Sequence, residues 1–362
     1  MTEKSNSHSG TRLLVIGAAL VIIIGGINQA EPVLASFLVA VFLSVIGTPP
    51  VLWLERKRVP SLVAVLIVVA GMITILLMIG VVVGTSVNGF SAALPIYQTR
   101  LREQVSALNA FLTSKGIGGI DKVLLEYVKP EEVMKLTAGM LARLGSALSN
   151  IVLILLTVTF ILFEASSFPV KLRAVLGDPQ KAFPQFTRFV DDIKRYMVIK
   201  TLISLATGVL IGIWLSLLGV DFPVLWGFLA FLLHYVPNIG FIIAAVPAVL
   251  LTLIQLGAGT AALASAGYLV VDLILGNVLE TRLMGRRLGL STLVVFLSLI
   301  FWGSLLGLIG MVLSVPFTMA LKFVCENNKG IQWIAVLLGR ELSSKDIPRA
   351  SKKHKLSGNR ND

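Results

Sequence analysis

A short polar segment interrupts the apolar second half of the chain at residues 234–240, which read His-Tyr-Val-Pro-Asn-Ile-Gly. His234, Tyr235 and Asn238 supply hydrogen-bond donors and acceptors, Pro237 lacks an amide hydrogen, and Gly240 permits unusual backbone angles. Irregular backbone at membrane depth is tolerated only inside protein or around a wet cavity, where transporters bind their substrates. We therefore expect these five residues to bind or gate a hydroxylated solute. The alternative is a plain turn at the membrane surface, with Tyr235 and His234 in the interfacial layer.

A second polar group follows in the apolar run 261–275, which contains Asp272. An ionisable side chain at the centre of a transmembrane helix costs about 2.5–3.5 kcal/mol on insertion scales, so its presence asks for a reason. Asp272 is therefore a candidate proton or cation site. The alternative is an interior hydrogen bond near the helix end, for which Asn277 is the expected partner. Asn277 and Glu280 complete the candidate substrate-binding or gating residues.

Other kinds of chemistry find no support in the sequence. Three histidines and a single cysteine, Cys325, make a Cys/His metal cluster improbable and exclude an internal disulfide. The chain has no Gly-x-x-x-x-Gly-Lys-Ser/Thr motif for nucleotide phosphates, and no spacing sets a nucleophile beside a base. We expect no catalytic residues, no bound metal and no cofactor, and therefore not an enzyme.

The elements that position these residues are apolar helices. Of 362 residues, 56% are hydrophobic and 14% charged, whereas soluble domains carry about 25% charged residues. Long apolar runs predict transmembrane helices of about 20 residues rather than the alternating segments of a membrane barrel. We expect an all-α integral membrane protein with about eight transmembrane helices, short or broken in the C-terminal half. The runs are 13–27, 33–46, 62–83, 151–163, 197–218, 222–236, 241–256, 261–275 and 293–324.

The last of these runs is too long for one comfortable span. Gly303, Gly307 and Gly310 crowd its middle and Pro316 lies in its second half. These residues predict two short helices folded back on each other.

Two charged residues lie near the ends of their runs. Lys200 and Glu164 are expected to extend their charged groups toward the cytoplasmic membrane surface.

The net charge of +12 comes mainly from short basic loops and the tail. Such clusters mark the cytoplasmic side of a membrane protein, so we expect an inner-membrane protein with both termini in the cytoplasm and no nucleic-acid binding. The clusters are 55–58, 171–195, 282–287 and the tail from residue 322.

We divide the chain into four parts. Residues 1–84 hold the N-terminal transmembrane helices, 85–147 form a helical soluble insertion outside the membrane, 148–324 form the main transport bundle, and 325–362 are a basic cytoplasmic tail. The insertion contains amphipathic stripes that need a partner, either their own neighbouring helices or another protomer.

Longer motifs resemble a known family. Residues 235–240 followed by Pro247 look like the central motif of the autoinducer-2 exporter family of bacterial permeases. The resemblance covers nearly the whole chain and is densest from residue 222 to 322. Thr281 stands where many members carry proline, which loosens the expectation of a rigid break after Glu280. The more specific matches are 276–280, 284–299, 301–303, Gly307, Gly310 and 314–316.

The resemblance implies export of autoinducer-2, a small furanone-derived polyol, by a homo-oligomeric ring, for which we expect a pentamer. Other branches of the family are credited with sodium–proton exchange. A cation–proton antiporter using Asp272 is therefore the first alternative, although a single credible intramembrane acid argues against it. A membrane scaffold that does not transport is the second alternative.

Overall fold

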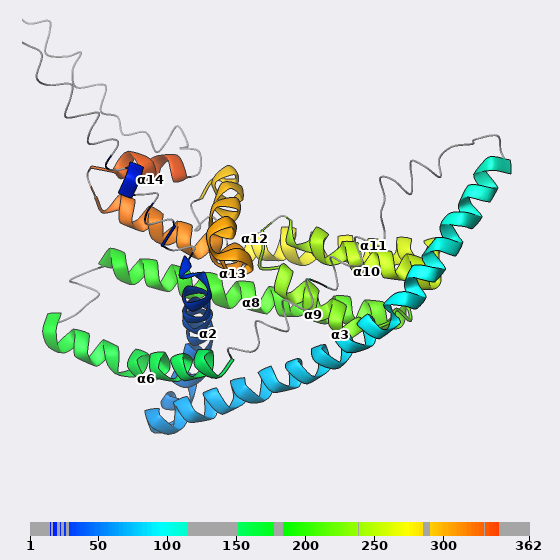
Figure 1. Ribbon diagram of the computed structural model, residues 1–362. Coiled ribbons are helices and arrows are strands. Elements are labelled where there is room, and N and C mark those ends of the chain that lie inside the picture. The colour runs from blue at the N-terminus through cyan, green and yellow to red at the C-terminus, as the bar shows by residue number, and fades with distance from the viewer. Residues whose placement is uncertain are drawn as a thin grey trace, which may run out of the picture.

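The computed structural model describes residues 29–114, 151–176, 184–237, 239–284, 290–328 and 330–339, with single positions at residue 139 and among residues 15–26. Within these ranges every regular element is a helix, and one isolated bridge joins Leu290 to Gly339 (Figure 1). The elements are α2 (Glu31–Arg56), α3 (Ser61–Ser114), α6 (Ile151–Leu176), α8 (Pro184–Leu217), α9 (Pro223–Leu233), α10 (Gly240–Leu256), α11 (Ala258–Val271), the π-helix η2 (Asp272–Glu280), α12 (Thr281–Met284), α13 (Thr292–Glu326) and α14 (Gln332–Leu338).

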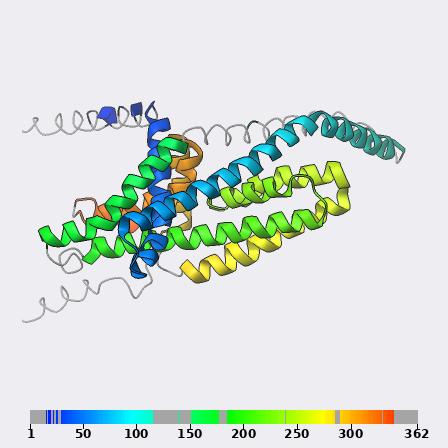
Figure 2. The ribbon, with the colours of Figure 1, turned by 90° about the horizontal axis from the view of Figure 1, so that it is seen from below.

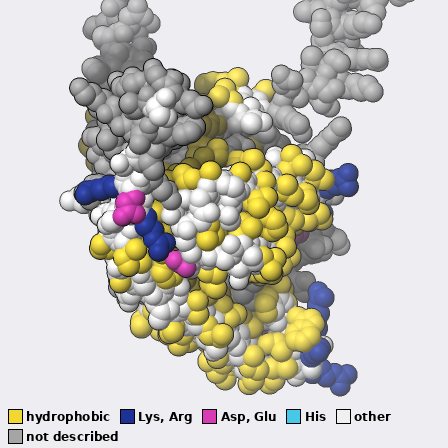
Figure 3. Space-filling model, turned by 90° about the vertical axis from the view of Figure 1, so that its right-hand side faces the viewer, with side chains coloured by type: hydrophobic (Ala, Val, Ile, Leu, Met, Phe, Trp, Pro, Cys, Tyr) yellow, Lys and Arg dark blue, Asp and Glu magenta, His cyan; other side chains and the backbone are white. Residues whose placement is uncertain are grey.

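The length and composition of these helices are those of a membrane protein. Five are long and apolar enough to cross a bilayer, and three shorter apolar helices accompany them in the described part of the chain. Large apolar side chains such as Ile75, Met78 and Val81 on α3 are exposed, as lipid contact requires, and hydrophobic side chains predominate on the face in Figure 3. The predicted all-α membrane protein is confirmed, whereas the count of eight spans stays a prediction.

The helices pack around three apolar clusters. One joins α2, α3 and α6 through residues such as Val51, Val65 and Leu162. A second joins the later part of α3 to α8–α11 around Trp226, and a third joins α8 to α13. Figures 1 and 2 show α9 and α11 running alongside α8, and α10 packs against both α9 and α11. The predicted polar break therefore lies inside a bundle of four neighbouring helices.

The N-terminal boundary of the predicted soluble insertion does not coincide with a helix end. Helix α3 is 54 residues long and passes through residue 84 without interruption. Residues 115–150, apart from 139, lie outside the described residues, as do 1–14 and the tail from 340. The four-part division of the chain stays a prediction.

The predicted fold-back in the last apolar run is confirmed within α13. Gly307 adopts a left-handed φ of 58°, and the helical course is broken there and at Leu306. The Trp302 ring packs 4.8 Å from the Phe317 ring, and its Nε1 donates to Thr318 Oγ1 at 3.3 Å. Residues 16 positions apart are thus in contact, because the glycine allows the chain to reverse.

Helices α8 and α9 approach unusually closely where two glycines face each other. A Cβ atom added at Gly208 would lie 2.6 Å from the Gly227 carbonyl oxygen and 2.7 Å from Phe231 Cβ. Gly212 lies one turn further along α8, and its Cα would be 3.1 Å from a Cβ at Gly227. Small residues at this spacing let helix backbones touch within a membrane.

Gly208→Ala should therefore lower the stability of the protein. The added methyl group meets backbone on the facing helix, and overpacking of this kind costs about 1–3 kcal/mol. Gly71→Ala on α3 is the control, since nothing lies within 4 Å of its Cβ position. Thermal unfolding of the detergent-purified variants should show a lower midpoint for Gly208→Ala only; equal midpoints would contradict the packing role.

Candidate functional site

The predicted break in the second half of the chain is present between α9 and α10. Helix α9 ends at Leu233 and α10 begins at Gly240. Backbone hydrogen bonds close the intervening turn, among them those from Val236 N to Leu233 O and from Gly240 N to Val236 O. Pro237 lies in this turn, half-buried. Asn238 lies outside the described residues.

Gly240 is needed for a different reason from the one predicted. Its backbone has no positive φ, so unusual angles are not the requirement. A Cβ atom at this position would instead collide with the Leu233 carbonyl group. The glycine lets the start of α10 lie directly against the end of α9.

Tyr235 points from the turn into the protein and is almost fully buried. Its hydroxyl lies 2.9 Å from Thr201 Oγ1 on α8, and its ring makes edge contacts with Phe42 on α2 and Phe231 on α9. His234 is buried as well. Neither side chain is exposed in the way that an interfacial anchor would be.

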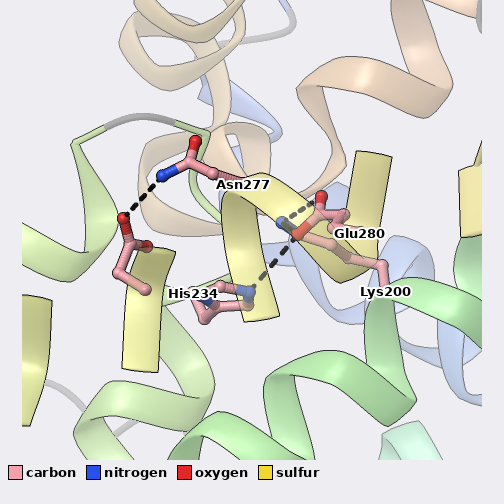
Figure 4. A network of polar contacts seen from close by, with 5 residues as sticks. Lys200, His234, Asn277 and Glu280 are labelled. Atoms are coloured by element: carbon pink, nitrogen blue, oxygen red, sulfur yellow. Dashed lines mark hydrogen bonds and ion pairs between the residues drawn. The ribbon is translucent and has the colours of Figure 1, made fainter. Parts of the chain in front are cut away.

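A buried ion pair lies beside His234. Lys200 Nζ on α8 lies 2.8 and 2.9 Å from the two carboxylate oxygens of Glu280 on η2, and His234 Nε2 lies 3.3 Å from Glu280 Oε2 (Figure 4). Lys200 is only 4% exposed. The expectation that Lys200 extends to the membrane surface is therefore wrong, because Glu280 compensates its charge inside the protein. Glu164, by contrast, is exposed.

Asp272 on η2 also comes near His234. Asn277 Nδ2 donates to Asp272 Oδ2 at 3.4 Å, so the predicted hydrogen bond is confirmed (Figure 4). A Cβ atom at Gly276 would lie 3.0 Å from Asp272 Oδ1 and 3.4 Å from His234 Cε1. The missing side chain at residue 276 thus lets the carboxylate and the imidazole come near each other.

The backbone that carries Asp272 and Glu280 is a π-helix. Helix α11 continues through η2 into α12 without a loop, and Thr281 has helical angles of −62° and −38°. The break expected after Glu280 is therefore absent, and Glu280 belongs to the apolar helix Ala258–Met284. π-helical turns frequently occur at functional sites, because they redirect side chains that an α-helix would place elsewhere.

The structure thus brings together four of the predicted residues, which are His234, Asp272, Asn277 and Glu280, and places Tyr235 one residue away. It adds Lys200 and Thr201, which the sequence analysis did not select. The position of Lys200 inside the apolar run 197–218 could have marked it as a candidate site residue. Nothing in the sequence indicated that its partner is Glu280, which lies 80 residues away. No group of three or more possible metal ligands is assembled among the described residues.

The pairing of Lys200 with Glu280 predicts non-additive stability effects. Lys200→Met should destabilise the protein by about 3–5 kcal/mol, because it leaves a largely buried carboxylate without its partner. The double variant Lys200→Met with Glu280→Gln should recover much of this loss. Thermal unfolding in detergent measures both, and strictly additive losses would show that the two groups act independently.

Comparison with known proteins agrees with this architecture. The family model described as AI-2E family transporter matches residues 16–329. The chain is 40% identical to the "AI-2 transport protein TqsA" of Escherichia coli (strain K12) over 91% of its own length and 96% of the relative. It is 39% identical to the "Putative transport protein YhhT" of the same strain, over 94% of this chain and 97% of the relative. A "Putative transport protein" of Haemophilus influenzae is 34% identical over 94% and 98%. The chain is a multi-pass membrane protein of the AI-2E family of transporters.

Proposed function

We propose that this protein exports a small polar signalling molecule related to autoinducer-2 across the bacterial inner membrane, with both termini in the cytoplasm. One observation carries the proposal. Polar and ionisable side chains converge on the break between α9 and α10, within a bundle of apolar helices. Such groups are costly in a membrane and mark transport pathways. Its relative TqsA is named as a transport protein for AI-2.

The charges of this site favour a neutral solute. The ammonium group of Lys200 and the carboxylate of Glu280 neutralise each other at 2.8 Å. The hydroxyl of Tyr235 and the imidazole of His234 remain as groups that can exchange hydrogen bonds with a polyol. The short helices α9 and α10 meet at a turn, so a small change in backbone angles there would move both side chains together.

We include in this proposal the homo-oligomeric ring, with a pentamer as the expected form, and lipid bilayer as the immediate environment. The exposed apolar side chains of α3 and α8 support contact with lipid or with a second protomer. Light scattering of the detergent-purified protein would measure the number of subunits.

Tyr235→Phe should reduce export. The substitution removes the hydroxyl that bonds Thr201 and that the proposal offers to the solute. A net hydrogen-bond contribution of about 0.5–1.5 kcal/mol predicts a decrease in export of about 2- to 10-fold. Tyr97→Phe is the matched control, because it also loses one hydroxyl, bonded to Asp221, at a distance from the break. Intracellular and extracellular autoinducer-2 should be measured in cells that lack the native gene and express equal amounts of each variant.

Unchanged levels of autoinducer-2 on both sides of the membrane, with and without the wild-type protein, would reject this substrate. An equal decrease for Tyr235→Phe and Tyr97→Phe would reject the role of the break.

Cation–proton exchange is a second candidate, because the structure removes the argument against it. The argument was that the sequence offered a single credible intramembrane acid, Asp272. The structure places a second, Glu280, within the same apolar helix and near the same histidine. Two carboxylates, an imidazole and an ammonium group in one protein interior could exchange protons and cations.

Asp272→Asn would abolish cation-dependent proton movement in inverted vesicles if this second activity exists, since the amide cannot release a proton. Glu326→Gln, an exposed acid at the end of α13, serves as the control and should retain the wild-type response. Full exchange by Asp272→Asn would exclude the antiporter mechanism through this residue.

A further inference from the structure

Two hydroxyl groups on α8 behave differently from most others in the described helices. Serine and threonine hydroxyls here typically donate to a carbonyl three or four residues earlier, which satisfies them within their own helix. Ser204 and Thr207 make no such bond, although they are 0% and 5% exposed. The residues that do form it include Ser44, Thr48, Thr201, Thr252, Ser265 and Thr318.

These two hydroxyls belong to a larger set of unpaired groups. Among the described residues, five buried side-chain polar atoms lack a hydrogen-bond partner, and four of them lie in the bundle of α8–α11. The four are Ser204 Oγ, Thr207 Oγ1, His234 Nε2 and Tyr268 Oη; the Nε2 atom has only its ion-pair approach to Glu280. A buried polar group without a partner costs about 1–3 kcal/mol, so a native protein normally supplies one.

The helical spacing shows where Thr207 points. Lys200 lies seven residues before it and contacts Glu280, and Trp214 lies seven residues after it and donates to the Leu263 carbonyl while filling the space beside Gly267. Residues seven apart lie on one face of an α-helix. Thr207 therefore faces the stretch of α11 and η2 between Gly267 and Glu280.

Tyr268, Asp272, Gly276 and Glu280 recur every four residues along that stretch. In an α-helix of 3.6 residues per turn this spacing drifts around the axis. The π-helix η2 begins at Asp272, and its i→i+5 bonding gives it more than four residues per turn. A spacing of four residues therefore falls short of a full turn in η2, which reverses the rotation around the axis that the same spacing produces in α11. The four residues thus lie on about the same face of α11 and η2. Gly276, which has no side chain, leaves room on this face beside His234.

We propose that a polar seam, formed by Ser204 and Thr207 on α8, Tyr268 on α11 and His234 in the turn, is a binding site for a neutral hydroxyl-bearing solute. Hydroxyl groups both donate and accept, so three of them together match the hydroxyls of a polyol. The charges of Lys200 and Glu280 at the end of the seam neutralise each other. Asp272 accepts a hydrogen bond from Asn277, and its carboxylate can accept further hydrogen bonds from the hydroxyls of a polyol.

This inference rests on the proposed transport function and deepens it. The proposed binding site then extends from the turn between α9 and α10 into the interface between α8 and α11–η2. Tyr235 then lies next to the end of the seam, since its hydroxyl meets Thr201, the residue that follows Lys200.

Single cysteines test the seam, because the chain has one cysteine, the buried Cys325, which Cys325→Ser removes. On that background, Ser204→Cys and Thr207→Cys should react with a charged, water-soluble thiol reagent in membrane vesicles. Ile211→Cys and Leu215→Cys are matched controls further along α8, equally buried but in the apolar cluster. Thiols react as hydrated thiolates, so the seam positions should label at least about 10-fold faster than the controls.

Neutral polyols, autoinducer-2 among them, should then be added one at a time at saturating concentration. A polyol that binds in the seam should slow the labelling of Ser204→Cys and Thr207→Cys. Labelling as slow as that of Ile211→Cys would overturn the seam, and labelling that no solute slows would show water alone and overturn the binding site. Protection by another polyol but not by autoinducer-2 would support the seam while rejecting the proposed substrate. If the cysteine variants do not yield folded protein, Ser204→Ala and Thr207→Val replace them. For these variants the solute flux should fall severalfold, while the thermal stability stays the same or rises. Unchanged flux would also overturn the seam.

Discussion

A lysine ammonium group buried between apolar helices must have its charge compensated within the protein, and this constraint organises the second half of the chain. Both carboxylate oxygens of Glu280 accept from Lys200, at 2.8 and 2.9 Å. The pair fixes the position of η2 along α8, since neither side chain can move away without leaving a buried charge. His234 lies against the same carboxylate, so the turn between α9 and α10 is tied to the pair as well. One ion pair thus connects three elements that are far apart in the sequence.

The close contact of α8 with α9 complements this arrangement. Gly208 and Gly227 let the two backbones touch, which places the end of α9, and hence His234, beside the part of α8 that carries Lys200 and Ser204. The π-helix contributes from the opposite side by orienting Asp272 and Glu280 toward the same space. Polar chemistry in an apolar environment is therefore positioned by backbone features, namely two glycines, a turn and a π-helix.

Much of the architecture could be predicted from the sequence, because apolar runs and chain breakers act locally. The fold-back at Gly307 and the turn between α9 and α10 both follow from residues that cannot continue a helix. Partners distant in the chain could not be predicted. Lys200 was assigned to the membrane surface because the sequence alone does not show Glu280 opposite it, and a π-helix leaves no clear signature in composition. The steric need for Gly240 was missed for the same reason, since the Leu233 carbonyl group that excludes a side chain becomes visible only when the turn is folded.

The length of α3 has a mechanical consequence. Its 54 residues at 1.5 Å each give about 81 Å of helix, more than twice the thickness of a bilayer core, and Figures 1 and 2 show that its course bends. Along its length, Phe90 packs against Phe222 and Trp226, and Tyr97 binds Asp221, at the corner between α8 and α9. These contacts hold the later part of α3 against the bundle, at the C-terminal end of α8 and away from Lys200. A force applied to the far end of α3 would therefore act first on this corner, and would reach the polar site only through the length of α8 and α9.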